Sequence, residues 1–256
     1  MKRIWGIVPA AGLGTRIQPL AFSKELLPVG MRFDGETERP RAVCEYLLDR
    51  MIWAGATRIC FVISPNKTDI MNYFGGRLEE ACICYAIQPS PNGLCDSIFT
   101  ALPFISEHDD VLIGLPDTIW FPEDGLAVLP EGQFSFLCFP VDKPAYFDAV
   151  VADERGRIQE IQVKKPNASS HWIWGALRLS GAELAKLYDL WRIRGRQDQY
   201  LGTLVNAHIA NGARVLAVKR GERYVDVGTL HGYREAVRIL SQPQEVREHV
   251  RKVEAA

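Results

Sequence analysis

A glycine-containing segment near the N-terminus, together with two cationic side chains, has the composition of a phosphate-binding loop. The segment Ala10-Ala11-Gly12-Leu13-Gly14-Thr15-Arg16 directly follows a short apolar run, and Lys24 lies a little further along. Glycines after a strand let backbone N–H groups approach a phosphate closely, while the two cations supply the charge that a polyphosphate needs. It is neither a P-loop nor a dinucleotide-binding loop, because no lysine follows Gly14 at the P-loop spacing and Ile17 replaces the third glycine. Taken alone, the glycines predict a tight turn about as well as an anion site.

Two aspartates from distant parts of the chain could bind a metal ion. Asp117 ends the run Val111-Leu112-Ile113-Gly114-Leu115-Pro116-Asp117, a strand whose carboxyl end is expected to open onto a ligand crevice. Asp226 lies in Tyr224-Val225-Asp226-Val227-Gly228-Thr229. Hard oxygen ligands from two segments, completed by phosphate oxygens, suit Mg²⁺. The alternative is that each aspartate only caps the turn or helix after it.

The elements that must position these residues follow from the periodicity of apolar side chains. The first half predicts strands at 4–9, 58–63, 83–87 and 111–115, alternating with helices at 42–54, 68–74 and 96–102. This rhythm favours a mainly parallel sheet covered by helices on both faces. Further strands are predicted at 134–139, 149–152, 158–163 and 172–179, and helices at 182–191, 201–211 and 230–240. The short connections between the later strands predict an antiparallel addition to the sheet, and the polar segment 31–41 is expected to be an exposed loop.

The composition excludes several classes of protein. The chain has 256 residues, of which 47% are hydrophobic and 24% charged, with a formal net charge of −1. Disordered and collagen-like chains are excluded, and the balanced charge gives no global field that would attract nucleic acid or an anionic membrane. No apolar run reaches the roughly 18 residues that a membrane span needs. The six cysteines form no CxxC pair and are expected to be mostly buried, reduced thiols in a cytoplasmic protein.

The phosphate-loop segment, Pro19 and Ser23-Lys24-Glu25-Leu26-Leu27-Pro28-Val29 together resemble the signature of the sugar-1-phosphate nucleotidylyltransferases. The opening Ile7-Val8-Pro9-Ala10-Ala11-Gly12 looks more like the uridylyltransferase branch. The segment Gln88-Pro89-Ser90-Pro91-Asn92-Gly93-Leu94 looks like the base-binding loop of the glucose-1-phosphate thymidylyltransferases. The resemblance extends to about Leu240 and implies a three-layer α/β/α, Rossmann-like nucleotidyltransferase fold with a mixed, mainly parallel sheet and an antiparallel insertion.

The reaction that this resemblance implies is Mg²⁺-dependent transfer of a nucleotidyl group from UTP or dTTP to a sugar 1-phosphate, with release of pyrophosphate. Arg16 would hold the departing pyrophosphate and Lys24 would contact the α-phosphate. Asp117 and Asp226 would hold Mg²⁺. Lys165, in Val163-Lys164-Lys165-Pro166, matches the lysine of the family that binds the sugar phosphate.

The remaining binding residues are also assigned from the resemblance. Those expected to bind the nucleotide are Ala11, Gly12, Gly14, Thr15, Gln88 and Gly93. Those expected to line the sugar pocket are Ala149, Lys164, Trp174 and Gly175. An amide such as Gln88 can both donate to and accept from the edge of uracil or thymine. For the tryptophans of His171-Trp172-Ile173-Trp174-Gly175, packing in the core is favoured over stacking on a sugar ring.

Two positions depart from the family pattern. Lys164 replaces an acidic residue that usually contacts a sugar hydroxyl, and Ala149 stands where relatives carry glycine. The charge reversal could suit an acidic or phosphorylated acceptor, so two other functions stay open: nucleotidyl transfer to a phosphorylated alcohol, and a non-catalytic nucleotide-binding module.

A single domain of residues 1–256 is expected, with a nucleotide-binding part at about 1–130, a sugar-binding part at about 131–240 and a C-terminal helix at about 241–256. The expected partners are a nucleoside triphosphate and a sugar 1-phosphate, with homo-oligomers possible.

Overall fold

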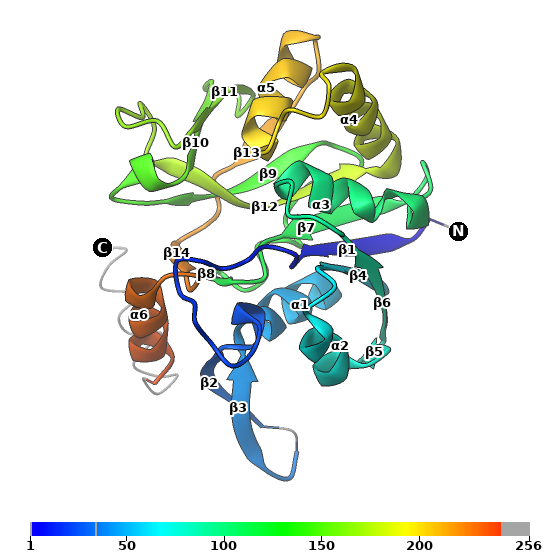
Figure 1. Cartoon of the computed structure of the whole chain (residues 1–256). Helices are drawn as coiled ribbons and strands as arrows, with labels where there is room; N and C mark the ends of the chain where they lie inside the picture. Colours follow the sequence, from blue (N-terminus) through cyan, green and yellow to red (C-terminus); the bar gives the residue numbers. More distant parts are fainter. Residues whose placement is uncertain (1, 34, 242–256) are drawn as a thin grey trace.

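The computed structural model describes residues 2–33 and 35–241 and shows a large sheet between two layers of helices (Figure 1). All but the first residue of the helix expected at 241–256 lies outside the described residues. Within the described part of the chain, no helix is long and apolar enough to cross a membrane. All six cysteines are free, and Cys82 is the exposed one.

Four parallel strands form the first half of the sheet, in the spatial order β7-β1-β4-β6. They are β1 (Ile4–Pro9), β4 (Arg58–Ile63), β6 (Ala81–Ile87) and β7 (Asp110–Gly114), and the two-residue strand β5 (Arg77–Leu78) pairs antiparallel with β6. The connecting helices are α1 (Val43–Trp53), α2 (Thr68–Phe74) and α3 (Leu94–Thr100). The parallel α/β half expected from the sequence is confirmed, with element ends within about two residues of those predicted.

Strand β12 (Trp172–Ser180) joins the second half of the sheet to the first, because it runs antiparallel to β7. The second half also contains β9 (Ser135–Pro140), β10 (Asp148–Ala152) and β11 (Ile158–Val163), which pair antiparallel, and β13 (Leu216–Val218), which runs parallel to β9. Helices α4 (Gly181–Ile193) and α5 (Leu201–Ala210) lie between β12 and β13 in the chain. The mixed sheet with an antiparallel addition is therefore confirmed as well.

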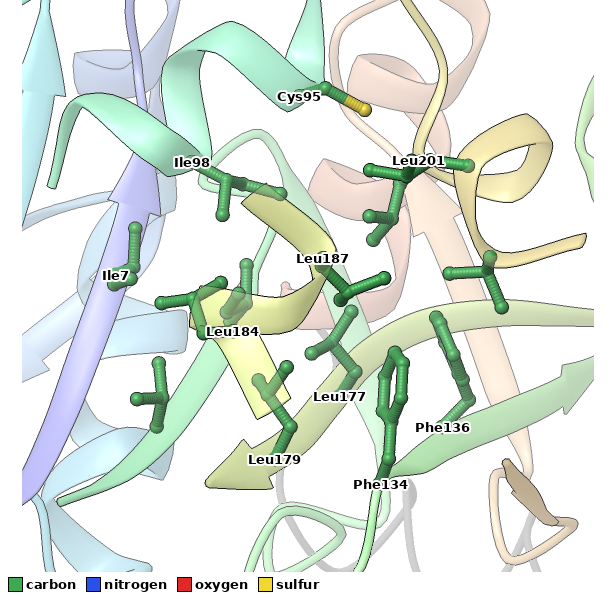
Figure 2. Packing of buried hydrophobic residues seen from close by; sticks show 14 of the residues in the cluster. Ile7, Cys95, Ile98, Phe134, Phe136, Leu177, Leu179, Leu184, Leu187 and Leu201 are labelled. Carbon is green, nitrogen blue, oxygen red and sulfur yellow. The ribbon is translucent and has the colours of Figure 1, made fainter. Parts of the chain in front are cut away.

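Alternating side chains of the strands create a separate apolar core on each face of the sheet. In β4, Cys60 and Val62 pack in one cluster, whereas Ile59, Phe61 and Ile63 pack in the other. The first cluster lies beneath α3, α4 and α5, where Ile98, Leu184 and Leu201 meet residues of β9 and β12 (Figure 2). Burial on both faces explains why the parallel strands have continuous apolar sequences rather than alternating ones.

A third apolar cluster lies beside the main sheet and joins segments from both ends of the chain. Its members come from the segment after the phosphate loop, from the ribbon of β8 (Thr118–Phe121) and β14 (Arg223–Asp226), and from α6 (Leu230–Leu240). The strands β2 (Pro28–Phe33) and β3 (Glu38–Ala42) form a hairpin that projects from the body (Figure 1). Most described residues of 31–41 are exposed, as expected, but the expectation of a loop is wrong, because they belong mainly to two paired strands. Arginine–carboxylate pairs, such as Arg32 with Asp49 at 3.1 Å, hold this hairpin to α1.

The junction of the two sheet halves contains a buried ion pair that gives the first prediction. Arg178 on β12 donates through Nε to Asp110 Oδ2 on β7 at 2.7 Å, and both side chains are almost fully buried. Arg178→Met leaves the buried Asp110 carboxylate with only the half-exposed Lys2, at 3.7 Å, as an ion-pair partner among the described residues. We therefore expect the free energy of unfolding to fall by about 3–5 kcal/mol in urea denaturation. The exposed variant Arg155→Met is the control, and an equal loss in both variants would contradict the prediction.

Candidate active site

The predicted nucleotide-binding segments meet at one edge of the sheet. The phosphate loop follows β1, Gln88 follows β6 and Asp117 follows β7, and these strands run parallel. The carboxyl ends of parallel strands therefore place all three segments along a single edge, which is where open α/β sheets bind ligands.

Four charged side chains from three segments form the centre of this edge, and we call them the charge quartet: Arg16, Lys24, Asp117 and Asp226. Lys24 Nζ donates a short hydrogen bond to Asp117 Oδ2. Arg16 Nη1 lies 2.7 Å from Asp226 Oδ2. The β8–β14 ribbon brings the two aspartates together, since Thr118 is paired with Asp226. Sequence reasoning assigned the four residues to one site without this ribbon, which it did not predict.

The two carboxylates converge in front of Gly228. A Cβ atom at Gly228 would lie 2.6 Å from Asp117 Oδ2, 3.0 Å from Asp226 Oδ1 and 3.4 Å from Arg16 Nη2. Asp226 also accepts a hydrogen bond from the Gly228 N–H at 3.0 Å, so it caps this turn as well as pairing with Arg16. Only glycine leaves the space between these groups open.

These oxygen donors fit a magnesium ion whose remaining ligands come from a bound substrate and water. Across residues 2–33 and 35–241, no three His, Cys, Asp or Glu side chains gather as a metal cage. Two converging carboxylate oxygens are what Mg²⁺ takes from proteins at sites where phosphate oxygens and water supply the other ligands. The quartet by itself has two positive and two negative charges, so it cannot neutralise a triphosphate without further positive charge.

Burial and ion pairing shift the pKa values of Asp117 and Lys24 in opposite directions. Burial alone would raise the pKa of Asp117, but Lys24 and Arg16 outweigh it and hold the pKa below its usual value. Burial would likewise lower the pKa of Lys24, but Asp117 and Glu25 raise it above its usual value. Each member of the pair therefore stays charged because the other is present.

The phosphate loop is open to solvent and packs against Lys24. Gly14 has φ +67°, and a Cβ there would come within 2.9 Å of Lys24 Cδ. Ala11 is buried, whereas Gly12 and Thr15 are exposed. The loop thus presents backbone and small side chains to solvent while its glycine makes room for the lysine stem.

The sequence analysis missed a residue that contacts the predicted base-binding loop. Gln88 is buried at the end of β6, and its Nε2 donates to Asp96 Oδ2 at 2.7 Å. This bond leaves the Gln88 carbonyl oxygen as an acceptor. Asp96 stands in the first turn of α3, three residues after Gly93, and this spacing could have suggested its role. Gly93 has φ +106°, and its missing side chain allows Leu94 N to reach Gln199 O at 2.9 Å.

The predicted acceptor residues lie on β10, on β12 and at the two positions directly after β11. Lys165 is half-exposed and lies 3.9 Å from Glu160. Lys164 has φ +44°, and its Nζ lies 3.3 Å from Tyr200 Oη and 4.5 Å from the centre of that ring. Within the described part of the chain, no hydrogen bond or ion pair joins either lysine to the quartet.

Three further acceptor residues are buried. Ala149 is fully buried, and Trp174 packs edge-on against Phe136 at 5.7 Å between ring centres. A Cβ at Gly175 would lie 2.6 Å from Tyr224 Cε2, so glycine lets the ring of Tyr224, two residues before Asp226 on β14, pack closely against β12. Trp174 is therefore part of the core in this structure, as the favoured interpretation of the tryptophans expected.

Comparisons with known proteins agree with this fold and arrangement. The sequence model of the Nucleotidyl transferase family matches residues 5–242, and the chain therefore belongs to that family of enzymes. A glucose-1-phosphate thymidylyltransferase of Neisseria meningitidis is 25% identical over 251 residues, with 94% of this chain and 84% of that protein covered. A UTP–glucose-1-phosphate uridylyltransferase of Haloferax volcanii is 23% identical, with 87% and 90% covered.

A solved structure shows the same fold. A UTP-bound UGPase of Acinetobacter baumannii superposes with a TM-score of 0.76 at 20% identity, with 100% of this chain and 99% of that chain covered. At this identity the match establishes the shared architecture of the two chains.

The paired ionisation of the quartet predicts a pH-dependent effect of removing Lys24. The folded-state pKa of Asp117 is lowered, so its pairing stabilises the fold above the unfolded-state pKa of about 3.9 and is lost as the pH falls further. Lys24→Met should therefore destabilise the protein by about 3 kcal/mol at pH 7 in urea denaturation, and the deficit should shrink at pH 3. Lys143→Met, at an exposed position, should change neither value. A deficit of equal size at both pH values would show that the loss is not electrostatic.

Proposed function

We propose that this protein is a Mg²⁺-dependent nucleotidylyltransferase that joins UTP or dTTP to a sugar 1-phosphate and releases pyrophosphate. The observation that carries the proposal is the convergence of the charge quartet at the carboxyl edge of the sheet, beside an open glycine loop. The names of the curated relatives, which are thymidylyltransferases and uridylyltransferases of glucose 1-phosphate, support the same substrates.

The transfer needs no covalent nucleophile from the protein. An oxygen of the acceptor phosphate attacks the α-phosphorus, a new P–O bond forms, and the bond to the bridging oxygen of the β-phosphate breaks as pyrophosphate leaves. Such a displacement is promoted by holding two anions in line and stabilising the charge that shifts between them. We assign Lys24 to the α-phosphate, Arg16 to the departing pyrophosphate and Lys165 to the acceptor phosphate.

The backbone of the phosphate loop would hold the triphosphate. Gly12, Gly14 and Thr15 stand directly after β1, with Gly12 and Thr15 exposed. Asp117 and Asp226 would hold Mg²⁺, which supplies the positive charge that the neutral quartet lacks. When the triphosphate binds, Arg16 and Lys24 would turn from these carboxylates to phosphate oxygens. In the described part of the chain, neither cation has an ion pair other than the one with its aspartate.

The base-binding loop supports a preference for uracil or thymine. Asp96 fixes the Gln88 amide with its NH₂ group toward the carboxylate, so the amide oxygen is free to accept the imide N–H of these bases. Cytosine has an acceptor at that position and would leave the Gln88 oxygen without a donor. Gly93 would bring backbone to the same edge.

The departures from the family pattern do not by themselves favour another acceptor. The Lys164 ammonium contacts the face and hydroxyl of Tyr200 at an exposed position. Burial raises the pKa of the nearby Asp148, and the Lys164 charge opposes this shift. Its charge thus already has partners within the protein. Ala149 is fully buried, so its methyl group packs inside the protein rather than projecting freely.

An assay of pyrophosphate release tests the proposed activity. With Mg²⁺, UTP or dTTP and a mixture of hexose 1-phosphates, we expect turnover that a chelator abolishes and added Mg²⁺ restores. Asp117→Asn should stay folded, although less stable because Lys24 loses its partner, and should lose about two orders of magnitude or more in turnover, the scale of losing one preorganised electrostatic contact. Asp153→Asn, in a turn between β10 and β11, is the control.

Two outcomes of this assay would contradict the proposal. Turnover only with phosphocholine or an alditol phosphate would mean a non-sugar acceptor, and no turnover with any acceptor would mean a non-catalytic binding module. Unchanged turnover in Asp117→Asn would remove that residue from the mechanism.

Base preference gives a separate prediction at Asp96. Asp96→Asn lets either end of the Gln88 amide face the new side chain, so the orientation of the amide is no longer fixed. We expect the ratio of kcat/KM for UTP or dTTP to that for CTP to fall by about tenfold, which is the value of one misdirected hydrogen bond. Asp189→Asn, on the exposed side of α4, should leave the ratio unchanged. An unchanged ratio in Asp96→Asn would argue against a role in base selection.

A further inference from the structure

The start of α2 binds the short turn that carries Lys24 from one side. Lys24 begins a one-turn 3-10 helix, Lys24–Leu26, and the residue before it, Ser23, is buried. Ser23 donates to Asp69 twice, through its backbone N–H to Oδ2 at 2.6 Å and through its hydroxyl to Oδ1 at 2.7 Å. Both oxygens of Asp69 therefore hold the residue that precedes Lys24.

A buried ion pair binds the same turn from the other side. Glu25 is fully buried, and Lys67 Nζ donates to both of its carboxylate oxygens at 2.8 Å. The third donor of Lys67 reaches Ala10 O at 2.7 Å, at the start of the phosphate loop. All three ammonium hydrogens are thus used, and a single lysine ties the Lys24 turn to the loop that follows β1.

Lys24 needs this support because its side chain is long and its target is specific. A lysine stem has several rotatable bonds, and ordering it costs rotamer entropy. The stem is confined by Gly14 beneath it and by Asp117 at its end, but these contacts can form only if the backbone of residue 24 is fixed. A displacement of about 1 Å in a catalytic group can reduce a rate by about 10².

We propose that Asp69 and Lys67 are positioning residues for the nucleotidyl transfer, which together hold the Lys24 turn against the phosphate loop. The proposal rests on the proposed function for its catalytic consequence. Neither residue reaches the quartet by a hydrogen bond or ion pair of the described chain, so both act through Ser23, Glu25 and Ala10. We call Asp69, Lys67 and their contacts with the Lys24 turn the brace. The brace is rigid because the buried side chains of Ile70 and Phe74 fix α2 to the sheet.

Asp69 is the better residue to change first. It is partly exposed, so water can solvate Ser23 once the carboxylate is removed. Removing Lys67 alone would instead leave Glu25 charged and buried, and the fold itself could fail. A matched control is Asp153, whose Oδ1 accepts two backbone N–H groups, from Arg155 and Arg157, each at 2.9 Å, in a turn of the opposite half.

The experiment compares Asp69→Ala with Asp153→Ala in steady-state kinetics, with and without Lys24→Ala. We expect Asp69→Ala to lower kcat about tenfold with KM changed less than about threefold, and to lower Tm no more than Asp153→Ala does. In the Lys24→Ala background, Asp69→Ala should have no further effect on kcat, because residues that act through one group are not additive. Asp69→Asn, which can still accept one hydrogen bond from Ser23, should lie between Asp69→Ala and the unaltered chain.

Three results would overturn the proposal: an unchanged kcat in Asp69→Ala, a loss equal to that in Asp153→Ala, or a loss that adds fully to that of Lys24→Ala. If the unaltered protein transfers no nucleotidyl group, the proposed function fails. Amide hydrogen exchange then tests separately whether Asp69 holds the Lys24 turn in place. Faster exchange in residues 23–27 of Asp69→Ala than in the unaltered chain would support it, and unchanged exchange would refute it.

Discussion

Two carboxylates that face the same small space repel each other, and the centre of this protein depends on how that repulsion is balanced. Asp117 and Asp226 are brought to one point by the β8–β14 ribbon, and each is paired with a cation from the N-terminal segment. Pairing outweighs burial at Asp117 and Lys24, since the pKa of Asp117 is lowered and that of Lys24 is raised. The quartet therefore combines balanced charge with two carboxylates that converge on one space.

The rest of the fold supplies rigidity to this centre. Four parallel strands, buried on both faces, fix where the phosphate loop, the base loop and Asp117 begin. The third apolar cluster then packs the ribbon and α6 against the segment after the phosphate loop. Because functional groups on loops are only as precise as the elements beneath them, the buried contacts of Lys67 and Asp69 matter as much as the residues that meet a substrate.

A short segment at the start of α5, residues 199–202, contacts both halves of the molecule close to the predicted base-binding loop. Gln199 accepts a hydrogen bond from Leu94, Tyr200 covers the Lys164 ammonium, and Gly202 packs against β11. A single short segment therefore touches both the predicted nucleotide-binding part and the predicted acceptor-binding part. The charge at Lys164 is held by this segment, which is why a reversal of charge at that position does not by itself define an acidic acceptor.

The sequence by itself determined the parallel α/β half, the antiparallel addition and the phosphate loop, because apolar periodicity and glycine spacing are local signals. It also selected Arg16, Lys24, Asp117 and Asp226, through motifs each confined to a few neighbouring residues. Only the tertiary structure decided that the aspartates adjoin. Strand β8 is four fully buried residues without alternation, and its pairing with β14 depends on contacts far apart in the chain. The hairpin of β2 and β3 was missed for a related reason. Its polar residues pair with carboxylates of α1, and the local sequence pattern does not indicate a partner that only folding brings close.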